Sequence, residues 1–435
     1  MIRALYDLTV WAAQSLLRRK LRRRGRAEPG YLHALEERFG HYTQPRPESD
    51  TAQGRPLIWI HAVSLGETRA AAILLTELRA RLPDMRLLLT HGTATGRAEG
   101  GKLLRAGDVQ VWQPWDTRAA TRRFFAHFRP DAGVLIETEI WPNLIDEGHR
   151  AGVPIALANA RLSVKSLRGA RRAAVWLRPA YAALSAVWAQ TEADAERLRL
   201  AGVRDVAVLG NLKFDAVPDA VAVARGQAWR ARATRPVVML ASSQPGEEQA
   251  LLVAIRALPQ PDRVQWLIVP RHPQRFDEVA GLIRAAGWPV SRRCAWPEEG
   301  PPAGAENGIW LGDSLGEMAC YYTLADAALL GGSFAPMGGQ NLIEAAACGC
   351  PVVMGPHTYN FHEAARLACQ AGAALRMDDM AQAVDAATTL LEDRPRQAAA
   401  RQAARAFAAS QHGAAARMTG ALQALLLAGM DKRQR

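Results

Sequence analysis

The chain has 435 residues, of which 49% are hydrophobic, so it can bury a substantial core and is long enough for two or three domains. Its formal net charge of +12 indicates an anionic partner, which could be a nucleic acid, a membrane surface or a phosphorylated substrate. The five cysteines are an odd number without a C-x-x-C pair, which argues against a disulfide framework and indicates reduced thiols in a cytoplasmic domain.

Residues 1–28 form a distinct N-terminal segment. Positions 5–17 are largely apolar but too short for a membrane span, and seven Lys or Arg residues follow within 18–26. A signal peptide carries its charge before the apolar stretch. The observed order favours a segment that dips into a bilayer and is held by anionic headgroups on the cytoplasmic side. The alternative is an amphipathic helix packed on the protein, with a solvated basic tail.

The next part of the chain, residues 29–213, alternates short apolar runs with helix-like stretches. Each run is bounded by Gly, Pro or polar residues, and helical periodicity follows it, as at 67–82 and 192–201. This alternation predicts a parallel sheet that is covered by helices on both faces. The predicted strands are 57–61, 86–90, 109–112, 133–137, 153–158, 186–190 and 206–210.

The pattern breaks at 214–235, which we interpret as a linker with some helix, and it restarts in a second domain at 236–413. Residues 414–435 predict a further amphipathic helix and a tail. The fold class is therefore α/β, with two tandem Rossmann-like, doubly wound domains. The predicted strands of the second domain are 237–241, 264–270, 308–312, 326–330 and 352–354.

The tetrapeptide S-L-G-E occurs twice, at 64–67 and 314–317, each time between a predicted strand and a predicted helix. Such a Ser and Glu can form a capping box, which is a purely structural role. The functional alternative is that Gly66 lets a ligand approach the backbone at the carboxyl end of a strand, so that Glu67 faces that ligand. The repeat predicts the same corner in both domains.

A second pair of carboxylates supports the functional alternative. Glu137 and Glu139 end a predicted strand and would share one face if the chain is still extended there. A neighbouring negative charge would raise the pKa of Glu67 and make it a better base. The structural alternative is that one carboxylate is solvated and the other is paired with an arginine.

In the second domain, residues 331–339 contain two Gly pairs between a strand and a helix, an arrangement typical of phosphate binding. Glu344 would lie in the first helical turn beside a ribose. Arg271 and His272 follow the strand 264–270 at the same edge and could contact a phosphate. Neither G-x-G-x-x-G nor a P-loop occurs, and a D-x-D pair and H-E-x-x-H spacing are also missing, so we predict no metal and no cofactor.

Together these segments resemble the 3-deoxy-D-manno-octulosonic acid (Kdo) transferases of lipopolysaccharide synthesis, in the order of that family and over nearly the whole chain. The one departure is Gln340, where the family commonly has His, and we assign it no catalytic role. The matching segments are H-A-V-S-L-G-E at 61–67, E-T-E-I-W-P-N at 137–143, A-N-A-R-L-S at 158–163, G-N-L-K-F-D at 210–215, P-R-H-P-Q-R-F at 270–276, G-D-S-L-G-E at 312–317, and G-G-S-F through M-G-P-H-T-Y-N-F at 331–361.

The resemblance implies an inverting glycosyltransferase of the B type that moves Kdo from CMP-Kdo to the glucosamine disaccharide of a lipid A precursor, lipid IVA. It implies that Glu67 is the general base and that Glu137 and Lys213 stabilise the transition state. The enzyme would work at the cytoplasmic face of the inner membrane, on whose anionic surface the N-terminal segment lies. The residues implied to contact CMP are Arg271, His272, Leu315, Gly316, Glu317, Asn341, Leu342, Ile343 and Glu344.

Two other functions stay open. A UDP-sugar transferase or epimerase shares the fold and the Gly-rich loop, although the segments 137–143 and 210–215 argue against it. A non-catalytic, membrane-associated nucleotide-binding protein would not require Glu67 and Glu137 at strand ends. Nucleic-acid binding is not predicted, because the basic charge lacks interleaved aromatic residues and a known module.

Overall fold

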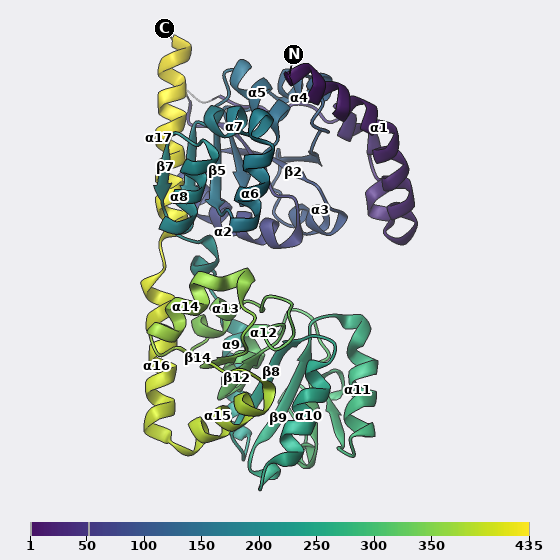
Figure 1. Ribbon diagram of the computed structural model, residues 1–435, viewed down its shortest axis with the longest axis vertical. Helices are drawn as coiled ribbons and strands as arrows, with labels where there is room; N and C mark the ends of the chain where they lie inside the picture. Colours follow the sequence, from purple (N-terminus) through teal and green to yellow (C-terminus); the bar gives the residue numbers. More distant parts are fainter. Residues whose placement is uncertain (1, 51–52, 435) are drawn as a thin grey trace. The chain divides into compact units, whose positions relative to one another are not determined.

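The computed structural model describes residues 2–50 and 53–434, and the chain forms two compact units (Figure 1). The first unit combines Met1–Asp215 with Gly413–Arg435, and the second is Ala216–His412. Positions 1 and 435, the outer ends of the predicted N- and C-terminal segments, lie outside the described residues. Each unit is an α/β structure built on a single seven-stranded parallel sheet. The sequence predicts the α/β class and the parallel sheets, with seven strands in the first unit but only five in the second.

The strands of the first sheet follow the order β3-β2-β1-β4-β5-β6-β7. Most of their residues are buried, as expected for parallel strands that helices cover on both faces. Chain order reverses between β1 and β4, which places the carboxyl ends of these two strands at a topological switch point. The strands are β1 Leu57–His61, β2 Arg86–His91, β3 Val109–Trp112, β4 Ala132–Ile136, β5 Ile155–Ala160, β6 Ala186–Ala189 and β7 Val206–Val208.

Helices cover this sheet on both faces and form two cores. One core joins the sheet to α4, α5, α6, α7 and α8, and the other joins it to α2 and α17. The helices of the unit are α1 Ile2–Ala27, α2 Leu65–Arg81, α3 Ala94–Gly101, α4 Arg118–Phe128, α5 Pro142–Arg150, α6 Val164–Arg172, α7 Ala174–Ala183, α8 Glu192–Ala201 and α17 Ala414–Gln434.

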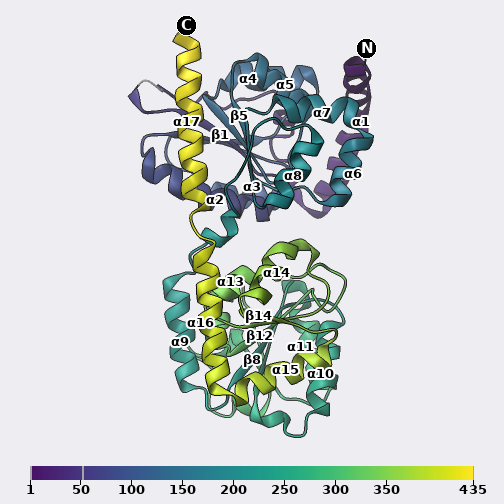
Figure 2. The same cartoon turned by 60° about the vertical axis from the view of Figure 1, so that its left-hand side comes forward.

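Helix α17, which the sequence predicts as a separate C-terminal segment, is part of the first unit and packs beside α2 (Figure 2). Ala414, Met418 and Leu422 recur every four residues and are fully buried in the core, so an apolar stripe fixes the helix there. The carboxylate of Asp215 caps the start of the helix, because it accepts hydrogen bonds from the backbone N–H groups of Gly413 and Ala415.

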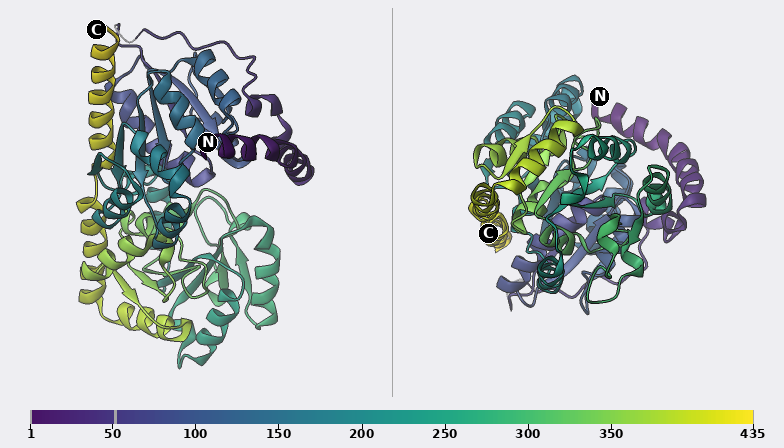
Figure 3. Two further views of the ribbon diagram at one scale, coloured as in Figure 1. Left: turned by 45° about the horizontal axis from the view of Figure 1, so that its top comes forward. Right: turned by 90° about the horizontal axis from the view of Figure 1, so that it is seen from below.

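Helix α1 lies on the opposite side of the first unit from α17 (Figure 3). Near its start, the Tyr6 hydroxyl donates to Asp116 at 2.6 Å and Asn143 donates to Asp7 at 2.7 Å. Near its end, Arg18 pairs with Glu36 at 2.9 Å. Among the residues described by the structure, no helix combines the length and apolar character that crossing a bilayer requires.

The sheet of the second unit has the strand order β10-β11-β9-β8-β12-β13-β14, with its switch point between β8 and β12. The short strands β10 and β14 at its two edges are not predicted from the sequence. The strands are β8 Val237–Ser243, β9 Gln265–Pro270, β10 Val290–Arg292, β11 Ile309–Leu311, β12 Ala327–Leu330, β13 Val352–Met354 and β14 Ala374–Arg376.

The helices of the second unit begin inside the segment that the sequence predicts as a linker. Helix α9 packs so closely on α12 that a Cβ on Gly226 would lie 2.4 Å from the carbonyl oxygen of Cys320. Trp229 of α9 is also buried, so this helix belongs to the domain. The helices are α9 Ala220–Arg232, α10 Glu247–Ala257, α11 Phe276–Ala285, α12 Met318–Leu324, α13 Leu342–Ala347, α14 His362–Gln370, α15 Met380–Glu392 and α16 Arg394–Ser410.

Candidate functional site

Glu67 lies in the first turn of α2, directly after β1 and next to the switch point of the first sheet. Ser64 is the N-cap, and its hydroxyl oxygen accepts the Glu67 N–H at 3.4 Å. The Ser64 hydroxyl donates to one oxygen of the Glu67 carboxylate at 3.2 Å, and the Val63 N–H donates to the other at 2.6 Å. The structural role of a capping box is therefore present at this corner.

The electrostatic surroundings of Glu67 go beyond a cap. Burial raises the pKa of its carboxyl group, and the nearby charge of Glu139 raises this pKa further, while the Val63 N–H lowers it. An ordinary capping glutamate faces solvent and is favoured as an anion by the helix N-terminus. A carboxylate with a raised pKa is a stronger base, which suits proton abstraction from a hydroxyl. A Cβ on Gly66 would meet only the Ser64 hydroxyl, at 4.0 Å, so packing does not require glycine there.

Glu137 follows β4 across the switch point and adopts a left-handed conformation with φ of +64°. This conformation is uncommon for a residue other than glycine and costs about 1–3 kcal/mol. The buried carboxylate accepts from Lys213 at 3.0 Å and from Arg161 at 2.9 Å, so two cations hold it. The predicted catalytic residues Glu137 and Lys213 are therefore in contact, although they are 76 positions apart.

The left-handed turn at Glu137 corrects the expectation that Glu137 and Glu139 share one face of an extended strand. The strand ends at Ile136, and the turn sends the two carboxylates to different partners. Glu139 accepts a hydrogen bond from the Trp141 indole at 2.7 Å and lies 3.8 Å from the Nε2 atom of His61. His61, the last residue of β1, is therefore a neighbour of the site that was not predicted from the sequence.

His61 is buried beside the site. Its Nδ1 atom lies 3.1 Å from the Thr90 carbonyl oxygen and 2.9 Å from the Thr90 hydroxyl, to which the Trp59 indole donates at 2.8 Å. Its Nε2 atom has no hydrogen-bond partner among the described residues and faces the Glu139 carboxylate at 3.8 Å.

If Glu67 is the base of a transfer reaction, as the family resemblance implies, Glu139→Gln should shift the pH profile of that reaction. Glu67 must be deprotonated to act as a base, so its raised pKa places the loss of activity on acidification at a higher pH than for an ordinary glutamate. Removing the Glu139 charge lowers the Glu67 pKa, so the acidic limb of kcat/KM should move to lower pH. Rates measured from pH 4 to 9 test this, and an unmoved limb would mean that Glu139 does not act on the base.

The Gly-rich loop of the second unit follows β12 at the switch point of that sheet, opposite the end of β8. The conformation of this loop is held by Glu247, a residue that was not predicted from the sequence. This buried carboxylate accepts backbone N–H groups from four positions around the loop, at 2.8 to 3.2 Å. The signal was a Glu in the first turn of a helix directly after a strand, at the edge where the loop lies. The four donors are Gln244, Gly332, Phe334 and Ala335.

The backbone itself requires the four glycines of this loop. A Cβ on Gly331 would lie 2.4 Å from the Ser242 carbonyl oxygen, because β8 and β12 are neighbours there. The other three, Gly332, Gly338 and Gly339, have positive φ. The fold therefore accounts for the Gly pairs without a ligand, and their value as evidence for a phosphate site is smaller than the sequence suggests.

The segment after β9 divides its basic residues between two roles. Arg271 and His272 are exposed at the carboxyl edge of the sheet, where a ligand can reach them. Arg275 is buried and makes a bidentate ion pair with Glu248 at 2.7 and 3.1 Å. This pair joins the loop after β9 to the helix after β8, so Arg275 holds the loop from which Arg271 projects.

The second S-L-G-E corner differs from the first. Helix α2 begins at Leu65, the second residue of its motif, whereas α12 begins at Met318, the residue after its motif. Ser314 is therefore not the N-cap of α12. Arg225 and Arg293 both bind Glu317, at 2.7 and 2.9 Å, and Ser314 donates to it at 2.5 Å. Burial opposes ionisation, but the hydrogen bonds from Ser314 and Arg293 outweigh it and lower the Glu317 pKa. The expectation of one corner in both domains is wrong.

The predicted CMP-binding residues therefore differ in what they can offer a ligand. Leu315 is exposed, whereas Leu342 and Ile343 are buried as whole residues and offer a ligand little surface in this structure. Asn341 caps α13 by accepting from the Ile343 N–H at 3.2 Å. Glu344 is half-buried in the first turn of that helix.

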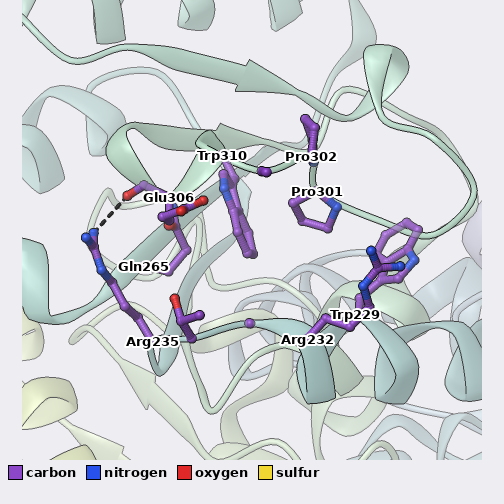
Figure 4. A pocket seen from close by; sticks show the side chains of 11 residues that line it. Trp229, Arg232, Arg235, Gln265, Pro301, Pro302, Glu306 and Trp310 are labelled. Carbon is purple, nitrogen blue, oxygen red and sulfur yellow. Dashed lines mark hydrogen bonds between the residues drawn. The ribbon is translucent and has the colours of Figure 1, made fainter.

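One cavity of about 270 Å³ lies at the end of the second sheet where β9 begins (Figure 4). Trp229, Arg235, Gln265 and Trp310 line it, and Arg235 donates to the Glu306 carbonyl oxygen at 2.8 Å. Gln265 begins β9, whereas Arg271 follows its carboxyl end. Because open α/β sheets bind ligands at the carboxyl ends of their strands, we do not assign the nucleotide to this cavity.

Two tandem Rossmann-like units, each with a single parallel sheet, define the fold class of this protein, the fold of the B-type glycosyltransferases. A glycosyltransferase structure from Rickettsia africae shares the fold, with a TM-score of 0.58 and 12% identity over 86% of this chain and 99% of that one.

Sequence comparison gives the family. The family model for 3-deoxy-D-manno-octulosonic-acid transferase (kdotransferase) matches residues 33–216. The 3-deoxy-D-manno-octulosonic acid transferase of Bordetella pertussis is 48% identical over 84% of this chain and 86% of its own length. That of Haemophilus influenzae is 30% identical over 83% of this chain and 84% of its own length. The chain therefore belongs to the Kdo transferase family, as its motifs predict.

Proposed function

We propose that this chain moves Kdo from CMP-Kdo to the glucosamine disaccharide of a lipid A precursor, lipid IVA. Membership of the family supports Kdo transfer in lipopolysaccharide synthesis. The observation that carries the finer proposal is Glu67, a partly buried carboxylate with a raised pKa at the switch point of the first sheet.

In the proposed reaction, Glu67 takes the proton of an acceptor hydroxyl, and the hydroxyl oxygen attacks the anomeric carbon of Kdo. The bond from this carbon to the phosphate breaks, and CMP leaves with the electron pair. One displacement inverts the anomeric centre and needs one base and no covalent intermediate. Lys213, fixed by Glu137, supplies positive charge for the Kdo carboxylate or the departing phosphate.

The donor would bind to the second unit. Arg271 and His272 would contact the phosphate, with the segment 315–317 and the start of α13 at 341–344 around the nucleoside. Glu344 would accept hydrogen bonds from the ribose hydroxyls. Glu247 would act indirectly, because it holds the loop beside which the nucleotide lies.

Incubation with CMP-Kdo and lipid IVA, followed by mass spectrometry, tests the proposed function. We expect a mass increase of the acceptor that corresponds to one or more Kdo residues. Product formed from UDP-sugars instead would favour the UDP-sugar transferase or epimerase. No product from any nucleotide sugar, together with tight CMP binding, would favour the non-catalytic alternative.

We expect Glu344→Ala to weaken CMP binding by about 1–3 kcal/mol, the range for losing a charged hydrogen-bond partner. Calorimetric titration of CMP measures this, with Glu363→Ala as a control, a half-buried glutamate in the first turn of α14 that pairs with Arg366. We also expect transfer to persist in excess EDTA, since a monophosphate leaving group carries less charge than a diphosphate. Unchanged CMP affinity would remove Glu344 from the site, and activity lost in EDTA but restored by Mg²⁺ would overturn the metal-free mechanism.

We further propose that α1 attaches the protein to the anionic inner membrane. Leu8, Trp11 and Leu16 are 59–68% exposed, an unusual state for large apolar side chains on one helix. Of the seven cations that follow, Arg18 pairs with Glu36 and Arg24 lies over the Tyr31 ring, and the other five are exposed. An apolar stretch beside free cations suits an interfacial helix.

We expect the triple variant L8S/W11S/L16S to release the protein from anionic vesicles. These side chains point away from the protein, so the substitution should leave both units folded. Sedimentation with phosphatidylglycerol vesicles tests this, with melting temperature as the control for folding. Binding as tight as that of the unchanged protein would place the attachment surface elsewhere.

A further inference from the structure

A second basic and apolar surface lies at the corner between α6 and α7. Residues 151–191 contain six Lys or Arg and no Asp or Glu. Lys165, Arg168 and Arg172 are spaced by three and four positions, so they share the outward face of α6, and all three are exposed. None of the ion pairs found among the described residues involves them. Arg118 and Arg122 of α4 and Arg150 of α5, in contrast, pair with Asp146 or Glu147.

Large apolar side chains accompany these cations. Val164 at the start of α6 is 55% exposed, Val175 in α7 is 57% exposed and Trp176 is 36% exposed. A partly exposed tryptophan beside unpaired cations is typical of protein surfaces that lie in the interfacial region of a membrane. We call Val164, Lys165, Arg168, Arg172, Val175 and Trp176 the α6–α7 surface.

Two contacts connect this surface with parts of the molecule already described. The ring of Trp176 lies 6.2 Å from that of Tyr6, so the surface adjoins α1. At its other end, α6 begins three residues after Arg161, which binds Glu137. The α6–α7 surface therefore extends from the proposed interfacial helix to the rim of the candidate active site.

We propose that the α6–α7 surface is a second contact with the anionic lipid bilayer, which Lys165, Arg168 and Arg172 bind through lipid phosphates. The proposal rests on the proposed function, because a lipid-borne acceptor reaches Glu67 and Glu137 only if this edge of the sheet is held at the membrane. Helix α1 alone gives one line of attachment, about which the unit could rotate. A second contact beside the site fixes the edge that faces the lipid.

The triple variant K165E/R168E/R172E tests the proposal in the full-length protein. Each cation near an anionic surface contributes about fivefold to binding, so reversal of three should weaken binding to phosphatidylglycerol vesicles by more than about 100-fold at low salt. The matched control is R263E/R284E/R396E, which makes the same change of net charge at exposed positions of the second unit. We expect the control to bind within about threefold of the unchanged protein, and both variants to bind equally poorly to phosphatidylcholine.

Three results would overturn the proposal. Equal affinity of the test and control variants would show that the effect is one of net charge, and unchanged affinity would remove the surface from the interface. A loss seen only with vesicles that contain the acceptor would assign the cations to acceptor phosphates instead. If K165E/R168E/R172E melts at a lower temperature, the neutral K165Q/R168Q/R172Q replaces it, with an expected loss of about 100-fold.

The transfer assay separates this proposal from the proposed function. With the acceptor dispersed in detergent, K165E/R168E/R172E should transfer Kdo at the unchanged rate, whereas with the acceptor in anionic vesicles it should be slower by the factor lost in binding. If the unchanged protein transfers no Kdo in detergent, the proposed function fails, and vesicle binding still reports on the surface. Equal loss of transfer in detergent and in vesicles would mean that these side chains act in the site and not on the membrane.

Discussion

Replacing Glu67 by Gln should reduce transfer by roughly 10²- to 10⁴-fold, the usual contribution of a positioned general base. The amide cannot take the acceptor proton, but its oxygen can still accept the Val63 N–H, so the corner keeps its hydrogen bond. The fold and CMP binding should therefore stay unchanged. Measurement of kcat and melting temperature on the same preparation tests both halves of this expectation.

Ser64→Ala is the matched control, because it removes the cap of α2 and leaves the carboxylate in place. Loss of an N-cap costs about 1 kcal/mol of stability, and turnover should stay nearly normal. The two variants thus separate the roles that the sequence alone could not. If Glu67→Gln is instead less stable and fully active, Glu67 is only the partner of Ser64, and the base must be sought elsewhere.

Strand positions were predictable because a parallel sheet needs continuous apolar runs. The predicted 57–61, 109–112 and 352–354 agree with β1, β3 and β13, and the other predicted strands differ by one or two residues at their ends. The edge strands β10 and β14 were missed. Each has three residues and is half-buried or partly exposed, so neither has an apolar pattern to detect.

The C-terminal helix shows the limit of reading a chain in order. Its amphipathic pattern at 414–428 predicts a helix, but not the domain that buries the apolar stripe. The partner of Gly413 and Ala415 is Asp215, about 200 positions away, and no local signal connects them. Similarly, α9 looks like a linker because Ala and Arg dominate it, whereas Gly226 and Trp229 carry its packing.

The site was predictable where a motif marks a strand end, and not where partners come from distant strands. Glu67 and Glu137 could be placed at one edge of a sheet from sequence. The left-handed turn at Glu137 could not, and neither could the two cations that hold its carboxylate, which come from 24 and 76 positions further along the chain. Glu247 was also missed, because its place after a strand was visible but its four donors are backbone groups, which have no sequence signature.

Replacing Lys213 by Met should reduce kcat by roughly 10²- to 10³-fold, the usual effect of removing one group that stabilises developing charge. Arg161→Met is the matched control. Both cations bind the same buried carboxylate, Glu137, at 3.0 and 2.9 Å, so each variant removes one charged partner from it. Both variants should therefore lose similar stability, about 1–3 kcal/mol.

The difference in kcat between Lys213→Met and Arg161→Met shows whether Lys213 has a role beyond its ion pair with Glu137. If Lys213 only neutralises Glu137, the two variants should lose the same activity as well as the same stability. If Lys213 also faces the Kdo carboxylate or the departing phosphate, kcat falls much further in Lys213→Met, and KM for CMP-Kdo changes little, because the lost interaction forms mainly in the transition state. Comparison of kcat, KM and melting temperature for both variants decides this. Equal kcat in the two would reduce Lys213 to a structural partner of Glu137.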